Sequence, residues 1–254
     1  MNLVVCVKHI PDPNLPGNME GNRLQRDGVQ GVLDPGDEFG VEAALRLKEA
    51  HGGDVTVVSM GPSQAQEAVR KALSMGADRS ILVTDDALRG ADALVTARVL
   101  AATIKRVEFD LVIAGVESTD GYTGTMPAAL AELLGVPQMT FANDLEVEGP
   151  NLTIHRQTSD GYHIVECPFP ALVTVTAGVN EPRYASFKGI MAAKKKPQEH
   201  LSVADLGLSS EELTYEQQVE DLTSEEERRA GEVVTDDGTG ASRIADFLQE
   251  AKVI

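Results

Sequence analysis

Short runs of β-branched and aliphatic residues recur along this chain, and helical patterns lie between them. Runs of this kind, bounded by turn residues, are typical of strands. Strands that alternate with helices are the mark of α/β proteins built on a parallel sheet. The alternation therefore predicts a doubly wound parallel sheet, with strands at residues 3–7, 54–58, 80–83, 111–114 and 171–176.

Helical patterns fill the gaps between these strands. The first, at residues 38–50, follows a long connection that is rich in Gly, Pro and Asn. In the second, Ser63 and Gln66 have the spacing of a capping box, and Gly76 supplies the stop. Asp92 is the expected N-cap of the third helix. The residues of that helix expected to face inward are Leu94, Val95, Val99 and Ile104.

Two later segments depart from the alternation. Residues 143–167 contain two short strand-like runs around a turn at 158–161, which predicts a β-hairpin added to the sheet. Residues 200–254 hold fourteen acidic and four basic residues. Such a tail cannot bury enough apolar surface to fold alone, and its apolar end predicts a short helix that docks on its own core or on another chain. The expected domains are residues 1–197, including a loop at 180–197, and an acidic C-terminal arm at 198–254.

The composition disfavours several classes of protein. A net charge of −18 and a pI near 4.6 disfavour nucleic acid as a partner, because its backbone phosphates would be repelled. No apolar stretch reaches 18 residues, and the apolar run at the N-terminus is too short for a signal peptide, so membrane spanning and secretion are not expected. Cys6 and Cys167 lie in apolar strand-like runs, which predicts reduced core thiols. The predicted location is cytoplasmic.

Motifs for catalysis and for metal binding are missing from the sequence. There is no P-loop, no G-x-G-x-x-G after a strand, no C-x-x-C and no H-E-x-x-H. The histidines are scattered, and no spacing pairs one of them with a Ser or Cys nucleophile. We therefore predict no catalytic residue and no metal ligand.

One loop between a predicted strand and a predicted helix has the composition of a nucleotide site. In open α/β sheets, ligands bind at the carboxyl ends of strands, and backbone N–H groups at a helix start bind phosphate. The glycines and threonines of this loop fit that role, whereas Glu117 and Asp120 suit sugar hydroxyls or an adenine amine. An ordinary Gly-rich turn is the alternative. The candidate residues are Gly115, Glu117, Ser118, Thr119, Asp120, Gly121, Thr123 and Gly124.

Other strand ends are expected to converge on the same crevice. They are residues 6–8 after the first strand and 59–62 after the second, and residues 34–37 approach just before the first helix. Together these segments form a plausible adenine nucleotide site. No residue among them is an obvious nucleophile or general base, so the site is expected to hold a nucleotide and not to cleave it.

Residues 180–197 combine positive charge with apolar side chains in an acidic protein. Five basic residues lie between Glu181 and Glu199. A surface with both properties is typical of partner binding. The alternative is an amphipathic last turn of the core whose lysines only solvate it. The apolar residues of the segment are Tyr184, Phe187, Ile190 and Met191.

Several motifs resemble the β subunit of electron-transfer flavoprotein. They are N-E-P-R-Y-A-S-F-K-G-I-M-A-A-K-K-K at 180–196, V-x-V-K at 5–8, D-E-F-G-V-E-A-A-L-R-L-K-E at 37–49 and G-P-x-Q-A-Q-E-A-V-R-K-A-L-S-M-G-A-D at 61–78. The resemblance covers residues 1–197. The tail, with G-E-x-V-x-D-x-G at 231–238, is similar to that of bacterial members.

The resemblance implies a heterodimer in which the α subunit carries the redox-active FAD. This subunit would be a Rossmann-like domain that is not an enzyme and that binds AMP structurally. In electron-bifurcating members, the same site holds a second FAD that accepts hydride from NADH. The nucleotide positions of the family map onto Cys6, Asp34, Asp37, Met60 and the loop 115–124.

The resemblance also implies a docking role for the basic and apolar segment. In the family, this segment binds acyl-CoA or related dehydrogenases by inserting one apolar side chain, which is Phe187 here where many members have Leu. The electrons would then pass through a quinone oxidoreductase to the respiratory chain. Lys194 to Lys196 would act on the rate of encounter, or would face the acidic tail or the α subunit. The recognition residues implied are Arg183, Tyr184, Phe187, Ile190, Met191, Lys194 and Lys195.

Two departures from the family pattern keep alternatives open. The loop at 120–124 lacks the Asn/Ala-Gln pair of many members, so both AMP and a second FAD stay possible in this subunit. At Arg156-Gln157, many members have Arg-Glu, at a position associated with steadying the mobile flavin domain. A free-standing ATP-binding stress protein of the same fold is a third interpretation, which rests on the crevice alone.

Overall fold

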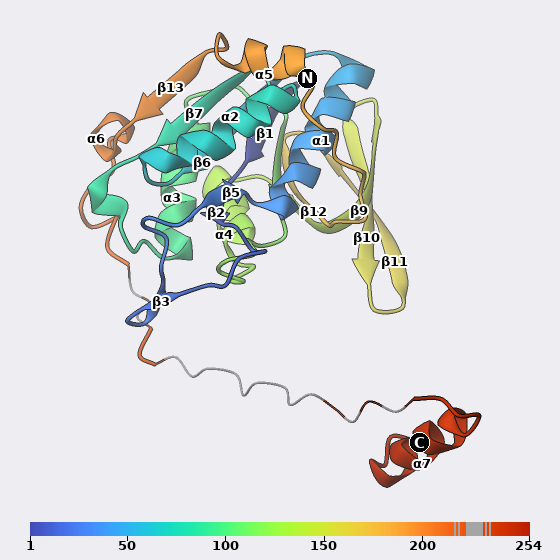
Figure 1. Cartoon of the computed structure of the whole chain (residues 1–254). Helices are drawn as coiled ribbons and strands as arrows, with labels where there is room; N and C mark the ends of the chain where they lie inside the picture. Colours follow the sequence, from blue (N-terminus) through green and yellow to red (C-terminus); the bar gives the residue numbers. More distant parts are fainter. Residues whose placement is uncertain (216, 218, 222–230, 232, 234) are drawn as a thin grey trace. The chain divides into compact units, whose positions relative to one another are not determined.

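The computed structural model describes residues 1–215, 217, 219–221, 231, 233 and 235–254. Within these residues, the main sheet has nine strands in the order β11-β10-β9-β12-β8-β1-β6-β7-β13 (Figure 1). Two short ribbons, β2-β5 and β3-β4, lie outside it. The strands are β1 Asn2–Cys6, β2 His9–Pro11, β3 Met19–Glu20, β4 Arg23–Leu24, β5 Gly31–Leu33, β6 Asp54–Met60, β7 Arg79–Val83, β8 Leu111–Gly115, β9 Gln138–Glu148, β10 Asn151–Thr158, β11 Gly161–Pro168, β12 Ala171–Val175 and β13 Gln198–Leu201.

The parallel core of this sheet confirms the predicted fold class. β1 pairs in parallel with β6 on one side and with β8 on the other, and β7, β12 and β13 extend the parallel arrangement. All five strands predicted from the alternation are present, with ends that differ by one or two residues. Their side chains are almost fully buried, which is why they read as continuous apolar runs.

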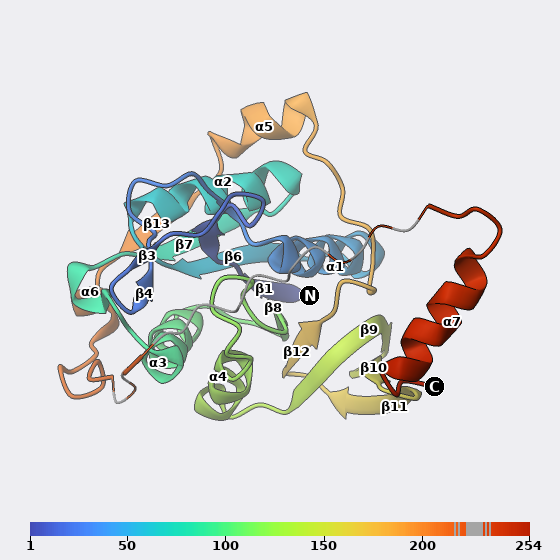
Figure 2. The ribbon, with the colours of Figure 1, turned by 60° about the horizontal axis from the view of Figure 1, so that its bottom comes forward.

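Helices cover both faces of the parallel core (Figure 2). Because side chains alternate along a strand, Val5 packs with α1 and α2, while Val4 packs with α3 and α4 on the opposite face. A further short helix, α5, lies against α2. The helices are α1 Pro35–His51, α2 Gln66–Met75, α3 Ala93–Ile104, α4 Met126–Leu134, α5 Phe187–Ala193, α6 Val203–Leu206 and α7 Gly240–Glu250, with 3₁₀ turns at Ser63–Ala65 and Asp86–Leu88.

The helix ends confirm two of the predicted signals and correct two others. Asp92 caps α3 by accepting a hydrogen bond from the Val95 N–H at 2.9 Å, and Gly76 ends α2 with a φ of 148°. The predicted capping box at Ser63 is wrong, because Ser63 starts a 3₁₀ turn and no side chain caps this turn or α2. Leu94, expected to face inward, is 40% exposed, because it lies on the outer side of the first turn of α3, whose next residue, Val95, is 1% exposed and faces the core.

The predicted hairpin is present and is part of a larger antiparallel extension. β10 and β11 pair from Asn151↔Pro168 to Thr158↔Gly161, around the expected turn. A third strand, β9, joins this hairpin to the parallel core, because it pairs in parallel with β12 and antiparallel with β10. The register shifts within β9, where Phe141 has a φ of 57°, a conformation that is rare for a residue with a side chain.

The segment after residue 197 begins with β13, which pairs with β7 at the edge of the sheet. The chain then follows α3, where the Arg106 and Arg98 side chains donate hydrogen bonds to the backbone carbonyls of Asp205 and Glu212. The chain divides into two compact units, Met1–Val219 and Glu220–Ile254. The second unit contains α7, which confirms the predicted terminal helix. Among the residues described here, no helix has both the length and the apolar character that crossing a bilayer requires.

Candidate functional site

The sheet has a topological switch point at the carboxyl ends of β1 and β8, where the sequence predicts a nucleotide site, and we call this place the crevice. From β1, the chain builds β6 and β7 on one side of the sheet and then returns to place β8 on the other side. The connections on either side of β1 therefore diverge, which in open α/β sheets is where ligands bind. Lys8 follows β1, the loop 115–124 follows β8, and α1 begins between them, as predicted.

Asp34 ties the start of α1 to the loop 115–124. It is fully buried, and its carboxylate accepts hydrogen bonds from the Gly36 N–H at 2.9 Å and from the Thr119 N–H at 2.8 Å. The Thr119 hydroxyl donates to the same carboxylate at 3.2 Å. Each carboxylate oxygen thus has a partner within the protein, so Asp34 fixes the shape of the loop from its buried side.

Asp37 makes a second tie, between α1 and the ends of β1 and β8. Its carboxylate accepts from the Lys8 N–H at 2.7 Å and from the backbone of Gly115. Burial, followed by the neighbouring Asp34 carboxylate, raises the pKa of Asp37 well above its ordinary value. Burial also raises the pKa of Cys6, with a smaller effect of Asp37, to about 12, so this thiol is a packed core group.

Asp120 is the centre of a charge cluster on the same loop. Lys8 donates from Nζ to Asp120 at 2.6 Å and to the Ser118 hydroxyl at 3.1 Å. Arg26 donates to the other Asp120 oxygen from Nε at 3.0 Å and from Nη2 at 2.6 Å. Burial opposes ionisation of Asp120, but Lys8 and Arg26 together hold its pKa below the ordinary value.

The long first connection, which carries Arg26, lies at the carboxyl ends of the parallel strands (Figure 1). Arg26 reaches the loop that follows β8, and the next residue, Asp27, pairs with Arg89 at 2.9 Å in the segment that follows β7. β1 and β6 lie between β8 and β7 in the sheet. The connection therefore spans the carboxyl ends of β1 and β6.

The end of the loop leaves the backbone of Thr123 and Gly124 open to a ligand, whereas the Gly121 N–H already donates to the Ser118 carbonyl at 3.2 Å. Gly121, Thr123 and Gly124 are exposed and lead into α4, whose first turn has no side-chain cap in the described structure. Glu117 is exposed beside them, and Met60 lies partly buried at the end of β6. The predicted site residues thus form two groups: Asp34, Asp37, Asp120 and Ser118 hold the loop, whereas Glu117, Gly121, Thr123 and Gly124 face outward.

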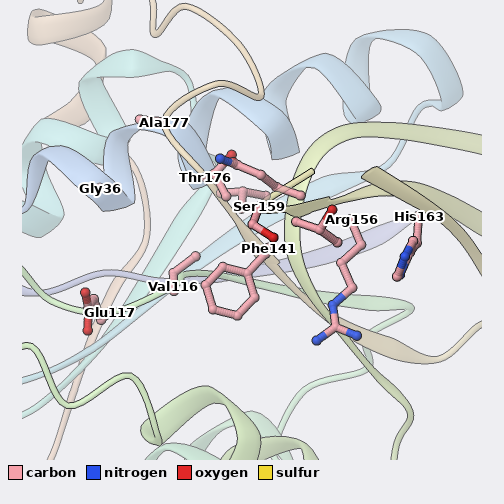
Figure 3. Close-up of a pocket in the computed structure, with 12 residues that line it drawn as sticks. Gly36, Val116, Glu117, Phe141, Arg156, Ser159, His163, Thr176 and Ala177 are labelled. Atoms are coloured by element: carbon pink, nitrogen blue, oxygen red, sulfur yellow. The ribbon is translucent and has the colours of Figure 1, made fainter. Parts of the chain in front are cut away.

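A hollow of about 760 Å³ adjoins the crevice and was not predicted (Figure 3). It shares Gly36 and Glu117 with the crevice and is bounded by the antiparallel extension through Phe141, Arg156 and His163. The Phe141 N–H donates to the Thr174 hydroxyl at 3.0 Å, and the positive φ of Phe141 leaves its ring half exposed. An aromatic residue in a strand-like run predicts a core position, so no sequence signal marks this residue.

The basic and apolar segment forms an exposed surface, which we call the docking segment (residues 184–195). Ser186 caps α5 by accepting from the Gly189 N–H at 3.0 Å, and Phe187 is the first residue of the helix. Tyr184 is 94% exposed and Phe187 is 81% exposed, and Ile190, Met191, Lys194 and Lys195 are also exposed. The structure brings all of these predicted residues to one short helix and the residues directly before and after it.

Lys196 and Arg183 differ from the other cations of this region. Lys196 donates from Nζ to the carbonyls of Leu73 at 2.9 Å and Ala77 at 2.6 Å, so it caps the end of α2. Arg183 pairs with Glu42 and Glu49 of α1. These two side chains therefore attach the docking segment to the core.

Gly189 explains how closely α5 can approach α2. A Cβ atom at this position would lie 2.3 Å from the backbone oxygen of Ser74, a distance that no real Cβ contact allows. Ala193, one turn later, is fully buried. The seat of α5 thus requires small residues at these two positions.

Comparison with known proteins identifies the relatives of this chain. The model of the electron transfer flavoprotein domain family matches residues 22–206. An electron transfer flavoprotein subunit beta of Mycobacterium tuberculosis is 40% identical, over 100% of this chain and 99% of its own length. That of Bacillus subtilis is 35% identical over the full length of both. A caffeyl-CoA reductase-Etf complex subunit, CarD, of Acetobacterium woodii is 37% identical over 98% of this chain and 96% of its own length.

Proposed function

The chain belongs to the electron transfer flavoprotein family as a beta subunit, and on this basis we propose that it forms a heterodimer with an α subunit that carries FAD. In this heterodimer it is an electron-carrier subunit and not an enzyme. Because the chain belongs to this family, we no longer interpret it as a free-standing ATP-binding stress protein. The observation that carries the proposal is the docking segment, which holds Tyr184 and Phe187 out from the core.

The partner of the docking segment is a dehydrogenase of the acyl-CoA or a related class. Phe187 inserts into an apolar pocket of that enzyme, because large exposed apolar side chains are the usual anchors of interfaces. Ile190 and Met191 lie on the same short helix and widen the apolar contact. Lys194 and Lys195 act on the rate of encounter. The electrons leave through a quinone oxidoreductase to the respiratory chain.

The crevice at the ends of β1 and β8 binds AMP as a structural group. The exposed backbone of Thr123 and Gly124, just before α4, offers N–H groups to a single phosphate, while the Gly121 N–H donates to the Ser118 carbonyl and shapes the turn. Glu117 accepts hydrogen bonds from the sugar or the base, and Met60 packs beside the nucleotide, whereas the Cys6 side chain is buried in the core. Asp34, Asp37 and Asp120 act on the nucleotide indirectly, since their carboxylates are bonded within the protein.

A second candidate function is electron bifurcation, with a second FAD in place of AMP. The observation that favours it is the hollow beside the crevice, because about 760 Å³ lined by Phe141, Val116 and Val175 gives room for a planar ring system next to a nucleotide. In this case the second flavin accepts hydride from NADH.

The source of electrons tests the proposed function against this alternative. The αβ complex is mixed without oxygen with an acyl-CoA dehydrogenase and its acyl-CoA substrate, or with NADH alone, and flavin absorbance is followed. We expect the dehydrogenase mixture to reduce the FAD of the complex and NADH alone to leave it oxidised. Reduction of the flavin by NADH alone would favour bifurcation, as would NADH-dependent ferredoxin reduction that requires a second acceptor to take the other electron. A complex that no acyl-CoA dehydrogenase reduces would refute the proposed docking role.

A further inference from the structure

The guanidinium group of Arg183 lies between two carboxylates of α1. It donates to Glu42 from Nε at 2.7 Å and from Nη2 at 3.1 Å. On its other side, it donates to both oxygens of Glu49, from Nη1 and from Nη2. The Arg183 N–H adds a bond to Glu42 at 3.2 Å. Such paired contacts hold a planar guanidinium in one orientation.

This clamp, formed by Arg183, Glu42 and Glu49, is fixed at its base. The Glu42 side chain is only 3% exposed, and Arg46 also donates to it at 2.8 Å. Burial disfavours the charged form of Glu42, but hydrogen bonds from Arg183 and Arg46 hold its pKa below the ordinary value. The hydrogen bond from Arg183 also lowers the pKa of Glu49. The two arginines and the two glutamates together carry no net charge.

Other contacts tie both ends of the docking segment to the core. Before it, the Asn180 amide donates to the Phe39 carbonyl at 2.9 Å, and Arg46 donates to the Glu181 carbonyl at 3.2 Å. After it, Lys196 caps α2. Arg183 is the last of the leading contacts, directly before Tyr184 and four residues before Phe187.

We propose that Arg183 is a positioning residue that acts on partner binding through Phe187. The clamp fixes the backbone at Arg183, the last residue before the docking segment that contacts α1. Phe187 is therefore held in the orientation that binding requires before the dehydrogenase arrives. Ordering a loop in advance removes a cost that would otherwise reduce affinity. This inference rests on the proposed docking function. It differs from direct recognition, in which Arg183 itself would contact an acidic group of the partner.

A double-mutant cycle in the αβ complex separates positioning from direct contact. The complex serves as the electron acceptor of an acyl-CoA dehydrogenase that reduces the unmodified complex, and KM and kcat for the complex are measured. We expect Arg183→Gln alone to raise KM about tenfold and to leave kcat unchanged. When Phe187 is already alanine, the same change should alter KM less than about twofold, because the side chain that Arg183 positions is gone.

Two further variants complete the test. Glu49→Gln weakens the clamp on its exposed side without removing Arg183, and, like Arg183→Gln, it should raise KM. Arg106→Gln removes an exposed ion pair with Glu199, outside both the crevice and the docking segment, and serves as the matched control, with KM unchanged. Equal factors for Arg183→Gln in both backgrounds, or no rise in KM, would overturn the positioning role. A Phe187→Ala complex with parental KM and kcat would instead refute the docking function itself.

Discussion

Replacing Phe187 with alanine is expected to slow electron transfer from an acyl-CoA dehydrogenase into the αβ complex by about 100-fold. Anchors of this kind cost about 2–4 kcal/mol when they are truncated. Phe187 is 81% exposed in the described chain, so its removal takes nothing from the core. Thermal stability and nucleotide content should therefore equal those of the parent.

The measurement is the rate of FAD reduction after rapid mixing with dehydrogenase that its acyl-CoA substrate has reduced. Phe187→Leu should retain most of the rate, because leucine is also a large apolar anchor. Tyr215→Ala removes an aromatic side chain that is 45% exposed and lies outside the docking segment, and it should leave the rate unchanged. If Phe187→Ala and the parent transfer electrons at equal rates, Phe187 is not the anchor.

Replacing Asp34 with alanine is expected to release the loop 115–124 from α1. The change leaves the N–H groups of Gly36 and Thr119 without the carboxylate that accepts from them. A buried N–H group that loses its partner costs about 1–3 kcal/mol. We expect hydrogen exchange of the loop amides to become about 100-fold faster, and the purified complex to lose its nucleotide.

Mass spectrometry of hydrogen exchange in the αβ complex measures this effect directly on residues 115–124. Asp34→Asn keeps one acceptor oxygen and should lie between the parent and Asp34→Ala. Glu199→Ala is the control, because Glu199 lies on the edge strand β13 and belongs to an exposed ion pair of the kind that contributes little. Unchanged exchange in Asp34→Ala would show that the loop holds its shape without this carboxylate.

The parallel core of the fold was predictable from the sequence because its strands are buried on both faces. Continuous apolar, β-branched runs such as those of β6 and β8 are stable only where both faces of the strand are buried, as in the centre of a parallel sheet. β13 was missed for the opposite reason. Its sequence, Gln198–Leu201, is mostly polar, since an edge strand exposes several of its side chains, and local patterns do not distinguish such a strand from a loop.

Local signals also failed where a neighbouring residue outweighed them. Ser63 and Gln66 have the spacing of a capping box, but Pro62 precedes a 3₁₀ turn that moves the start of α2 to Gln66. Asp92, with no such turn between it and its helix, caps α3 as predicted. The presence of each helix was therefore easier to predict than the residue at which it begins.

The candidate site was predictable as a set of segments and not as a set of contacts. The carboxyl ends of β1 and β8 meet because the topology requires it. The partners of Asp120 and Asp34 are separated from them by 94 and 85 residues, at Arg26 and Thr119. The clamp on Arg183 joins residues that are 141 and 134 positions apart. No local pattern encodes such pairs. From the sequence we therefore assigned Asp34 and Asp120 to the nucleotide and Arg183 to the partner, whereas in the structure their side chains bond within the protein.

The nucleotide content of the purified αβ complex tests the central claim most directly. The complex is denatured, and the released ligands are separated and quantified against the protein. Our account predicts one FAD and one AMP per heterodimer, with the AMP lost from the Asp34→Ala complex. Two FAD molecules and no AMP per heterodimer would contradict it and would assign the crevice of this subunit to a second flavin.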